Sequence, residues 1–179
     1  MENISYYDTI KDIDNQMKKY NIDWSKQHCG VHQASINEVL NLMPDLWRIL
    51  HDFPDNPENF TFDVKVHMLM PRQYACIPNW HYDNVPRENG IQRFDLCKLQ
   101  LPMYMFVSGA PLTQFRHGYI LPERWVRFSQ ADEHRGTASS DFTWRGFIRA
   151  THADILPPKG GDYLRRHAQV YLDAETFQW

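Results

Sequence analysis

Residues 60–70, FTFDVKVHMLM, alternate apolar and polar side chains, and this pattern limits the fold of the chain more than any other feature. A period of two is typical of a β-strand with one buried face, because successive strand side chains point to opposite sides. The apolar set is Phe62, Val64, Val66, Met68 and Met70, and the polar set is Thr61, Asp63, Lys65 and His67. We therefore expect a half-buried strand whose polar side, His67 included, faces solvent.

Later segments predict further strands at residues 98–109, 119–130 and 144–156, and residues 168–179 form either another strand or a packed tail. Within the second of these, Val126 and Phe128 flank Arg127, which we expect to point outward. Short strands separated by turn residues are typical of β-sandwiches and small barrels. The chain is therefore predicted to be mostly β.

A helical layer is expected before the strands. Ser35 and Glu38 have the spacing of a capping box, and Pro44 favours the first turn of a second helical segment. Residues 1–27 are polar and predict a strand or a loosely packed arm, and residues 51–60 predict a loop. We divide the chain into an N-terminal helical extension over residues 1–60, packed on a barrel, and a β domain over residues 61–179.

Charge and composition argue against several classes of partner. The net charge of −3 gives no support for nucleic acid binding, and no stretch is apolar enough to span a membrane. The N-terminus is acidic and does not resemble a signal peptide, and three cysteines without a CxxC pair favour a reducing compartment. We expect a cytoplasmic protein.

Basic residues gather in the middle of the chain. Residues 61–150 hold eleven Lys or Arg against eight Asp or Glu, a balance of +3, and nine of the eleven are Arg. Because the guanidinium group grips carboxylates and phosphates with a planar fork, this excess favours a small anionic ligand. Solvated strand edges are the alternative explanation.

Four of the nine histidines are weighed as candidate metal ligands: His81, His117, His134 and His152. His81 and Asp83, in PNWHYDNVPR, are two residues apart, so on an extended segment their side chains point the same way. An iron site with open positions needs two imidazoles and one carboxylate on one side of the metal. The third ligand is then His134 or, at shorter separation, His117, whereas His152 is expected at an exposed strand end.

The order of HYD at residues 81–83, then His134, then Arg145 resembles the Fe(II)- and 2-oxoglutarate-dependent oxygenases. These enzymes are built on the double-stranded β-helix, or jelly roll, of the cupin superfamily. The resemblance covers residues 61–150. It implies that His81, Asp83 and His134 bind Fe(II), that Arg145 holds the far carboxylate of 2-oxoglutarate, and that the enzyme hydroxylates a C–H bond of its substrate. The excess of arginine favours an anionic small molecule as that substrate.

The pattern departs from the family after the arginine. The family often has Ser or Thr two residues after the clamp, whereas this chain has Phe147, and Arg149 lies on the same strand face as a rival clamp. Tyr104 is a further candidate contact of the cosubstrate. The candidate substrate contacts are Trp80, Tyr82, Arg87 and Arg116. The alternative functions are a non-catalytic cupin-like protein that binds a small anion or metal, and a structural β-domain.

Overall fold

The structure is a computed structural model of the 179-residue chain and describes residues 20–172. Its helical elements are η1 (Trp24–Lys26), α2 (Ile36–Leu42), η2 (Pro44–Leu46), α3 (Trp47–His51), η3 (Pro57–Asn59) and η4 (Phe94–Leu96). The strands are β1 (Gly30–Ala34), β2 (Phe60–Leu69), β3 (Gln73–Tyr74), β4 (Arg87–Glu88), β5 (Ile91–Gln92), β6 (Met103–Ser108), β7 (Thr113–Phe115), β8 (Gly118–Tyr119), β9 (Val126–Phe128), β10 (His134–Gly136), β11 (Thr143–His152) and β12 (Tyr171–Leu172). The described part of the chain is mostly β, as predicted.

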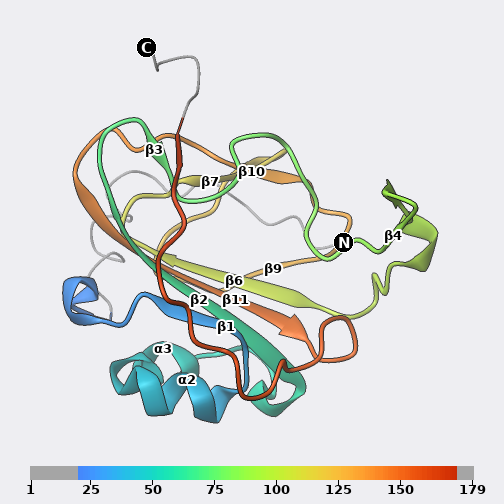
Figure 1. Ribbon diagram of the computed structural model, residues 1–179, viewed down its shortest axis with the longest axis horizontal. Helices are drawn as coiled ribbons and strands as arrows, with labels where there is room; N and C mark the ends of the chain where they lie inside the picture. The colour runs from blue at the N-terminus through green and yellow to red at the C-terminus, as the bar shows by residue number, and fades with distance from the viewer. Residues whose placement is uncertain (1–19, 173–179) are drawn as a thin grey trace.

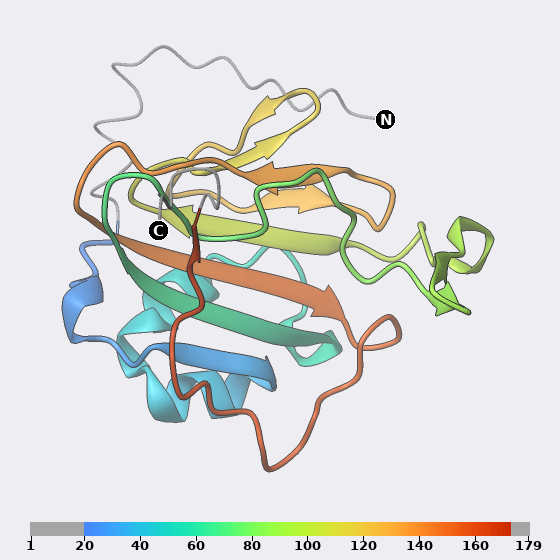
Figure 2. The same ribbon diagram turned by 45° about the horizontal axis from the view of Figure 1, so that its top comes forward.

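The strands form one large antiparallel sheet and smaller ones. The large sheet has five strands in the order β1-β2-β11-β6-β9, and a three-stranded sheet has the order β10-β7-β8. Helices α2 and α3 lie on one side of the large sheet, and β7 and β10 lie on the other (Figures 1 and 2). The large sheet is therefore the middle layer, and its second face looks toward the smaller sheet.

The helical layer begins and breaks where the sequence predicts. Ser35 caps α2, and the Glu38 carboxylate accepts from the Ser35 backbone N–H, which completes the capping box. Pro44 opens η2, so the segment is two short helical pieces. Their buried side chains pack on the apolar face of β2, which carries Phe62 and Val64.

The N-terminal segment also contributes a strand that the sequence analysis did not identify. Strand β1 pairs with β2 at the edge of the large sheet, and α2 and α3 share one hydrophobic core with β2 and β11. Trp24 joins this core, and its Nε1 donates to the Ser108 Oγ at 2.8 Å. The predicted arm at residues 1–27 lies mostly outside the described residues.

The polar face of β2 is buried, and the prediction that His67 faces solvent is wrong. His67 is 0% exposed and Asp63 2%, whereas Met68, on the apolar face, is 45% exposed. The helical layer covers only part of the apolar face, while the opposite face lies inside the molecule. Asp63, Lys65 and His67 stand directly opposite Arg149, Phe147 and Arg145 of β11, respectively.

The remaining strand predictions are met in part. The predicted segments include β6, β9 and β12, and β11 begins one residue before its segment. Strands β6 and β9 are shorter than expected, and residues 173–179 of the last predicted segment lie outside the described residues. Val126 and Phe128 are buried and Arg127 is exposed, which confirms the alternation predicted there. None of the helices within residues 20–172 has the length and apolar character that a bilayer crossing requires.

Candidate metal centre

The side chains of His81, Asp83 and His134 converge at one point of the interior. One ligand atom from each lies within 4.8 Å of the other two. The Nε2 of His134 is 3.3 Å from the Asp83 Oδ2, and the Nε2 of His81 is 4.0 Å from the Asp83 Oδ1. Two imidazoles and one carboxylate are a donor set suited to Fe(II) and related divalent metals.

The backbone explains why residues so distant in sequence meet here. His81 and His134 face each other in an isolated antiparallel bridge, with N–H···O distances of 2.9 and 3.0 Å in the two directions. Side chains of directly paired residues lie on the same side of the pair. Asp83, two residues beyond His81, reaches the same side.

Both imidazoles are oriented by backbone carbonyls. The Nδ1 of His81 is 2.9 Å from the Asn79 carbonyl oxygen, and the Nδ1 of His134 is 3.1 Å from that of Asp132. A carbonyl oxygen only accepts, so each Nδ1 carries the proton and each Nε2 presents a lone pair. Burial lowers the pKa of His81, which favours the neutral form that binds metals.

Asp83 is held as an anion by Arg149. Burial by itself would raise the pKa of Asp83, but the charge of Arg149 outweighs it and holds the pKa well below its usual range. The Arg149 Nη1 donates to the Asp83 Oδ2 at 2.6 Å, and its Nη2 donates to the Asp63 Oδ2 at 2.6 Å. Arg149 is thus engaged with two carboxylates of the protein itself.

Arg145 is buried without an acidic partner among the described residues. It is 1% exposed, and its Nη2 donates to the Thr113 Oγ1 at 2.8 Å. Its Nε has no hydrogen-bond partner within the described part of the chain. Burial lowers the pKa of Arg145 to about 10, so the group still carries its charge at neutral pH. Of the two rival arginines, Arg145 is therefore the one free to hold an external carboxylate.

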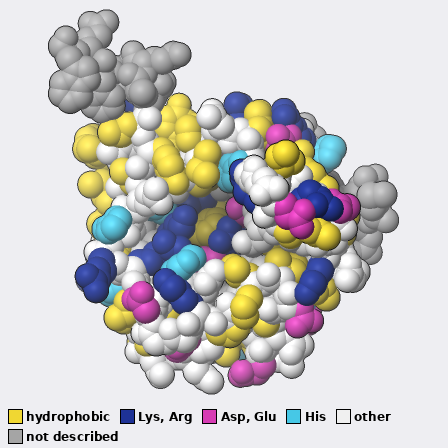
Figure 3. Space-filling model, turned by 45° about the vertical axis from the view of Figure 1, so that its right-hand side comes forward, with side chains coloured by type: hydrophobic (Ala, Val, Ile, Leu, Met, Phe, Trp, Pro, Cys, Tyr) yellow, Lys and Arg dark blue, Asp and Glu magenta, His cyan; other side chains and the backbone are white. Residues whose placement is uncertain are grey.

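A hollow of about 90 Å³ adjoins the three candidate ligands. Lys65, Cys76, Thr113, Phe147 and Tyr171 are among the residues that line it. Lys65 lies over the Phe147 ring at 5.9 Å, and residues 20–172 supply no ion-pair partner for it. Figure 3 shows a hollow on one face of the molecule with Lys and Arg side chains in it and His side chains near its margin.

Several other predicted site residues lie elsewhere. Tyr104 is on the opposite face of the large sheet, where it packs on Phe53, so its predicted contact with the cosubstrate is wrong. The reason is strand parity, because Met103 and Met105 are the β6 residues that face the interior. His117 is exposed at the turn between β7 and β8 and is not part of the triad.

Two more of these residues lie away from the three ligands. Arg87 is exposed on the β4–β5 hairpin and donates to the carbonyl of Gly90 within that hairpin. His152 is half-buried rather than exposed, and it lies opposite Phe60 in the register of β11 with β2.

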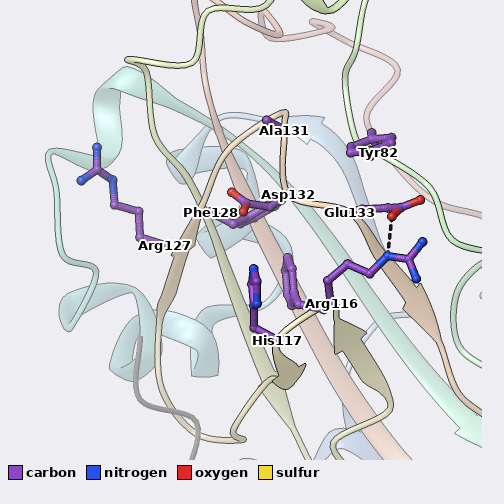
Figure 4. A pocket seen from close by; sticks show the side chains of 9 residues that line it. Tyr82, Arg116, His117, Arg127, Phe128, Ala131, Asp132 and Glu133 are labelled. Carbon is purple, nitrogen blue, oxygen red and sulfur yellow. Dashed lines mark hydrogen bonds and ion pairs between the residues drawn. The ribbon is translucent and has the colours of Figure 1, made fainter. Parts of the chain in front are cut away.

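A second cavity, of about 190 Å³, includes Tyr82, Arg116 and His117 in its lining. Figure 4 shows Arg116 joined to Glu133 at one side of this cavity and Arg127 pointing away from the other side chains. Phe115 and Phe128 line the cavity and also pack on the His134 ring, so they stand between the cavity and the triad.

Trp80 and Tyr82, the neighbours of His81 in sequence, both make aromatic contacts. The guanidinium groups of Arg116 and Arg135 lie 3.9 and 4.7 Å from the Trp80 ring centre. Tyr82 packs edge-to-face on Phe94, with ring centres 4.8 Å apart. Neither of these two aromatic residues lines the hollow at the three candidate ligands, and Tyr82 lines the second cavity.

The sequence analysis missed the inward charges of β2, Asp63 and Lys65. Both residues alternate with apolar residues that the helices cover. This alternation led to the prediction of a strand with one buried, apolar face and one solvent-exposed, polar face. Paired with the two arginines of β11 at the same parity, they were a recognisable signal for a buried polar site.

Comparison with known proteins returns no match: no family model fits the chain, and neither a curated protein nor a solved structure is similar to it.

Proposed function

We propose that the chain is an Fe(II)- and 2-oxoglutarate-dependent oxygenase. The observation that carries this proposal is the convergence of His81, Asp83 and His134 at a hollow whose lining residue Thr113 binds Arg145, a buried arginine that lacks an acidic partner among the described residues. Metal ligands alone would fit many proteins. A buried positive charge behind the wall of the same hollow is expensive unless an anion neutralises it, which favours an anionic cosubstrate.

His81, Asp83 and His134 would hold the metal. Three protein ligands leave coordination positions open for a chelating cosubstrate and dioxygen. When bound, Fe(II) supplies the chemistry that couples conversion of 2-oxoglutarate and dioxygen into succinate and carbon dioxide to hydroxylation of a C–H bond. The protein's own contribution is to bind, orient and exclude water.

Arg145 would bind the carboxylate of 2-oxoglutarate that is remote from the metal. Thr113 holds one arm of its guanidinium group and leaves Nε without a partner in the described part of the chain, so the side chain is oriented before the ligand arrives. Lys65 lines the hollow that Thr113, the partner of Arg145, also lines, and it adds a second positive charge there. Together they suit a dianion better than a monoanion, while Phe147 and Met105 supply apolar walls.

The arrangement of layers supports a double-stranded β-helix as the fold behind this proposal. The proposed clamp lies on the long strand β11 of the large sheet, and one ligand lies on β10 of the smaller sheet that faces it. Trp80, Tyr82 and Arg116 remain candidate contacts for a small-molecule substrate, because two of them flank the first ligand and the third stacks on Trp80.

The test is anaerobic addition of Fe(II) and 2-oxoglutarate, followed by visible absorption spectroscopy and a thermal melt. We expect a weak metal-to-ligand charge-transfer band and a raised melting temperature in the wild type, and neither in His134→Ala. His117→Ala is the matched control and should behave as the wild type. Admission of oxygen should then produce succinate, even without substrate.

The other outcomes are equally informative. Stabilisation by both ligands without any succinate would instead support a non-catalytic protein that binds a metal and a small anion. An absent band together with an unchanged melting temperature would reject both functions.

A further inference from the structure

Asp63 is a buried carboxylate that is linked to the proposed metal ligand Asp83 through Arg149. It is 2% exposed, and it accepts from the Arg149 Nη2 at 2.6 Å on one oxygen. Its other oxygen lies 2.7 Å from the His32 Nδ1 and 3.2 Å from the Arg165 Nη2. Asp63, His32 and Arg165 are not among the residues proposed to hold iron or 2-oxoglutarate, whereas Arg149 contacts the proposed ligand Asp83.

The position of Arg149 explains what Asp63 does for Asp83. A guanidinium group facing a single carboxylate tends to pair with both of its oxygens. Here Asp63 and Asp83 each take one arm, since Nη2 goes to Asp63 and Nη1 to the Asp83 Oδ2. The Asp83 Oδ1 receives no bond from Arg149 and is the oxygen turned toward His81.

We propose that Asp63 is a positioning residue for the metal site, which acts through Arg149 to keep one oxygen of Asp83 open for the cation. This inference rests on the proposed metal centre and adds a residue that no family resemblance supplies. Without the Asp63 charge, the guanidinium group pairs fully with Asp83 and competes with the metal for both oxygens.

The electrostatics of Asp63 agree with this role. Burial by itself would raise its pKa, but the charge of Arg149 and the hydrogen bond from His32 outweigh burial and hold the pKa well below its usual range. Asp63 therefore remains an anion at any pH at which the protein functions, and its hold on Arg149 is permanent.

The test uses Asp63→Asn and titration with Co(II), whose visible bands report the ligands around it and which tolerates air. We expect the Co(II) affinity of the variant to fall by about 10- to 100-fold, the usual range for groups that orient a metal ligand. Arg165→Gln is the matched control. It removes one charge from the same network without touching Arg149, so its Co(II) affinity should stay within about threefold of the wild type.

A second variant covers the case in which Asp63→Asn does not fold. Arg149→Lys keeps the charge but loses the planar fork whose two arms separate Asp63 from Asp83, so it should also weaken Co(II) binding about tenfold or more. Urea unfolding of each variant separates loss of metal affinity from loss of stability.

The outcomes separate the two proposals. Weaker Co(II) binding in both variants with an intact Arg165→Gln control supports the inference. If Asp63→Asn binds Co(II) as tightly as the wild type, the inference is overturned and the metal centre stands. Where Asp63→Asn does not fold, the same result with Arg149→Lys has the same meaning. A wild type that binds no Co(II) overturns the metal centre and this inference together.

Discussion

Replacement of Arg145 by Met should stabilise the protein while it weakens binding of 2-oxoglutarate. Burial lowers the pKa of Arg145 to about 10, well below its ordinary value, and one pKa unit corresponds to about 1.4 kcal/mol. At neutral pH the group is charged in both the folded and the unfolded chain, so its burial costs roughly 3 kcal/mol of folding free energy. Methionine fills similar space without the charge.

The net gain is smaller than this cost, because the variant also loses the hydrogen bond to Thr113. Such a bond contributes about 1 kcal/mol, so we expect the free energy of unfolding to rise by about 2 kcal/mol. The lost charge-assisted contacts to the ligand should weaken 2-oxoglutarate binding by about 3 kcal/mol, or roughly 100-fold.

The assay is urea unfolding at pH 7, with calorimetric titration of 2-oxoglutarate into the Co(II)-loaded protein. Arg149→Gln is the matched control on the same strand face. It leaves Asp63 and Asp83 buried without their shared partner and should lose about 3–5 kcal/mol of stability. The reasoning fails if Arg145→Met destabilises the protein as much as Arg149→Gln does, or if it binds 2-oxoglutarate as well as the wild type.

Three further outcomes are expected. The pKa of His67 is lowered to about 3 by burial and Arg145. Between pH 3 and pH 6.5 the unfolded chain therefore binds a proton at His67 that the folded chain does not. In urea unfolding from pH 7 to pH 5, the wild type should lose about 2 kcal/mol more stability than His67→Gln. Equal losses of stability in the two proteins would contradict this. Gly146→Ala should destabilise by about 1–3 kcal/mol in thermal melts, since its Cβ would lie 2.3 Å from the Trp24 ring; an unchanged melt would show that the ring yields. In Co(II) titrations His117→Ala should bind with the affinity of the wild type. If His117→Ala loses as much Co(II) affinity as His134→Ala, His117 is a ligand and the proposed triad is wrong.

Local features of the chain were predictable because they depend on a few neighbouring residues. The capping box at Ser35 and Glu38, the break at Pro44 and the period of two along β2 all follow from backbone geometry. The same is true of His81 and Asp83, which share one side of an extended segment whatever else the chain does. The choice of His134 also agrees with the structure, although the sequence left His117 as a rival.

Which side of each strand lies inside was decided only by the tertiary structure. The apolar face of β2 packs on the helices, so its polar face, with Asp63, Lys65 and His67, lies inside the molecule, and Lys65 lines the hollow. The same parity placed Tyr104 of β6 on the far side.

The roles of Arg145 and Arg149 were likewise open in the sequence, because both arginines lie on one strand face. Asp63 and Asp83, 86 and 66 residues away from Arg149 along the chain, both accept hydrogen bonds from it. Arg145 instead donates to Thr113, which lines the hollow. Burial and pairing between segments so far apart depend on how the layers stack, and a local pattern carries no information about that.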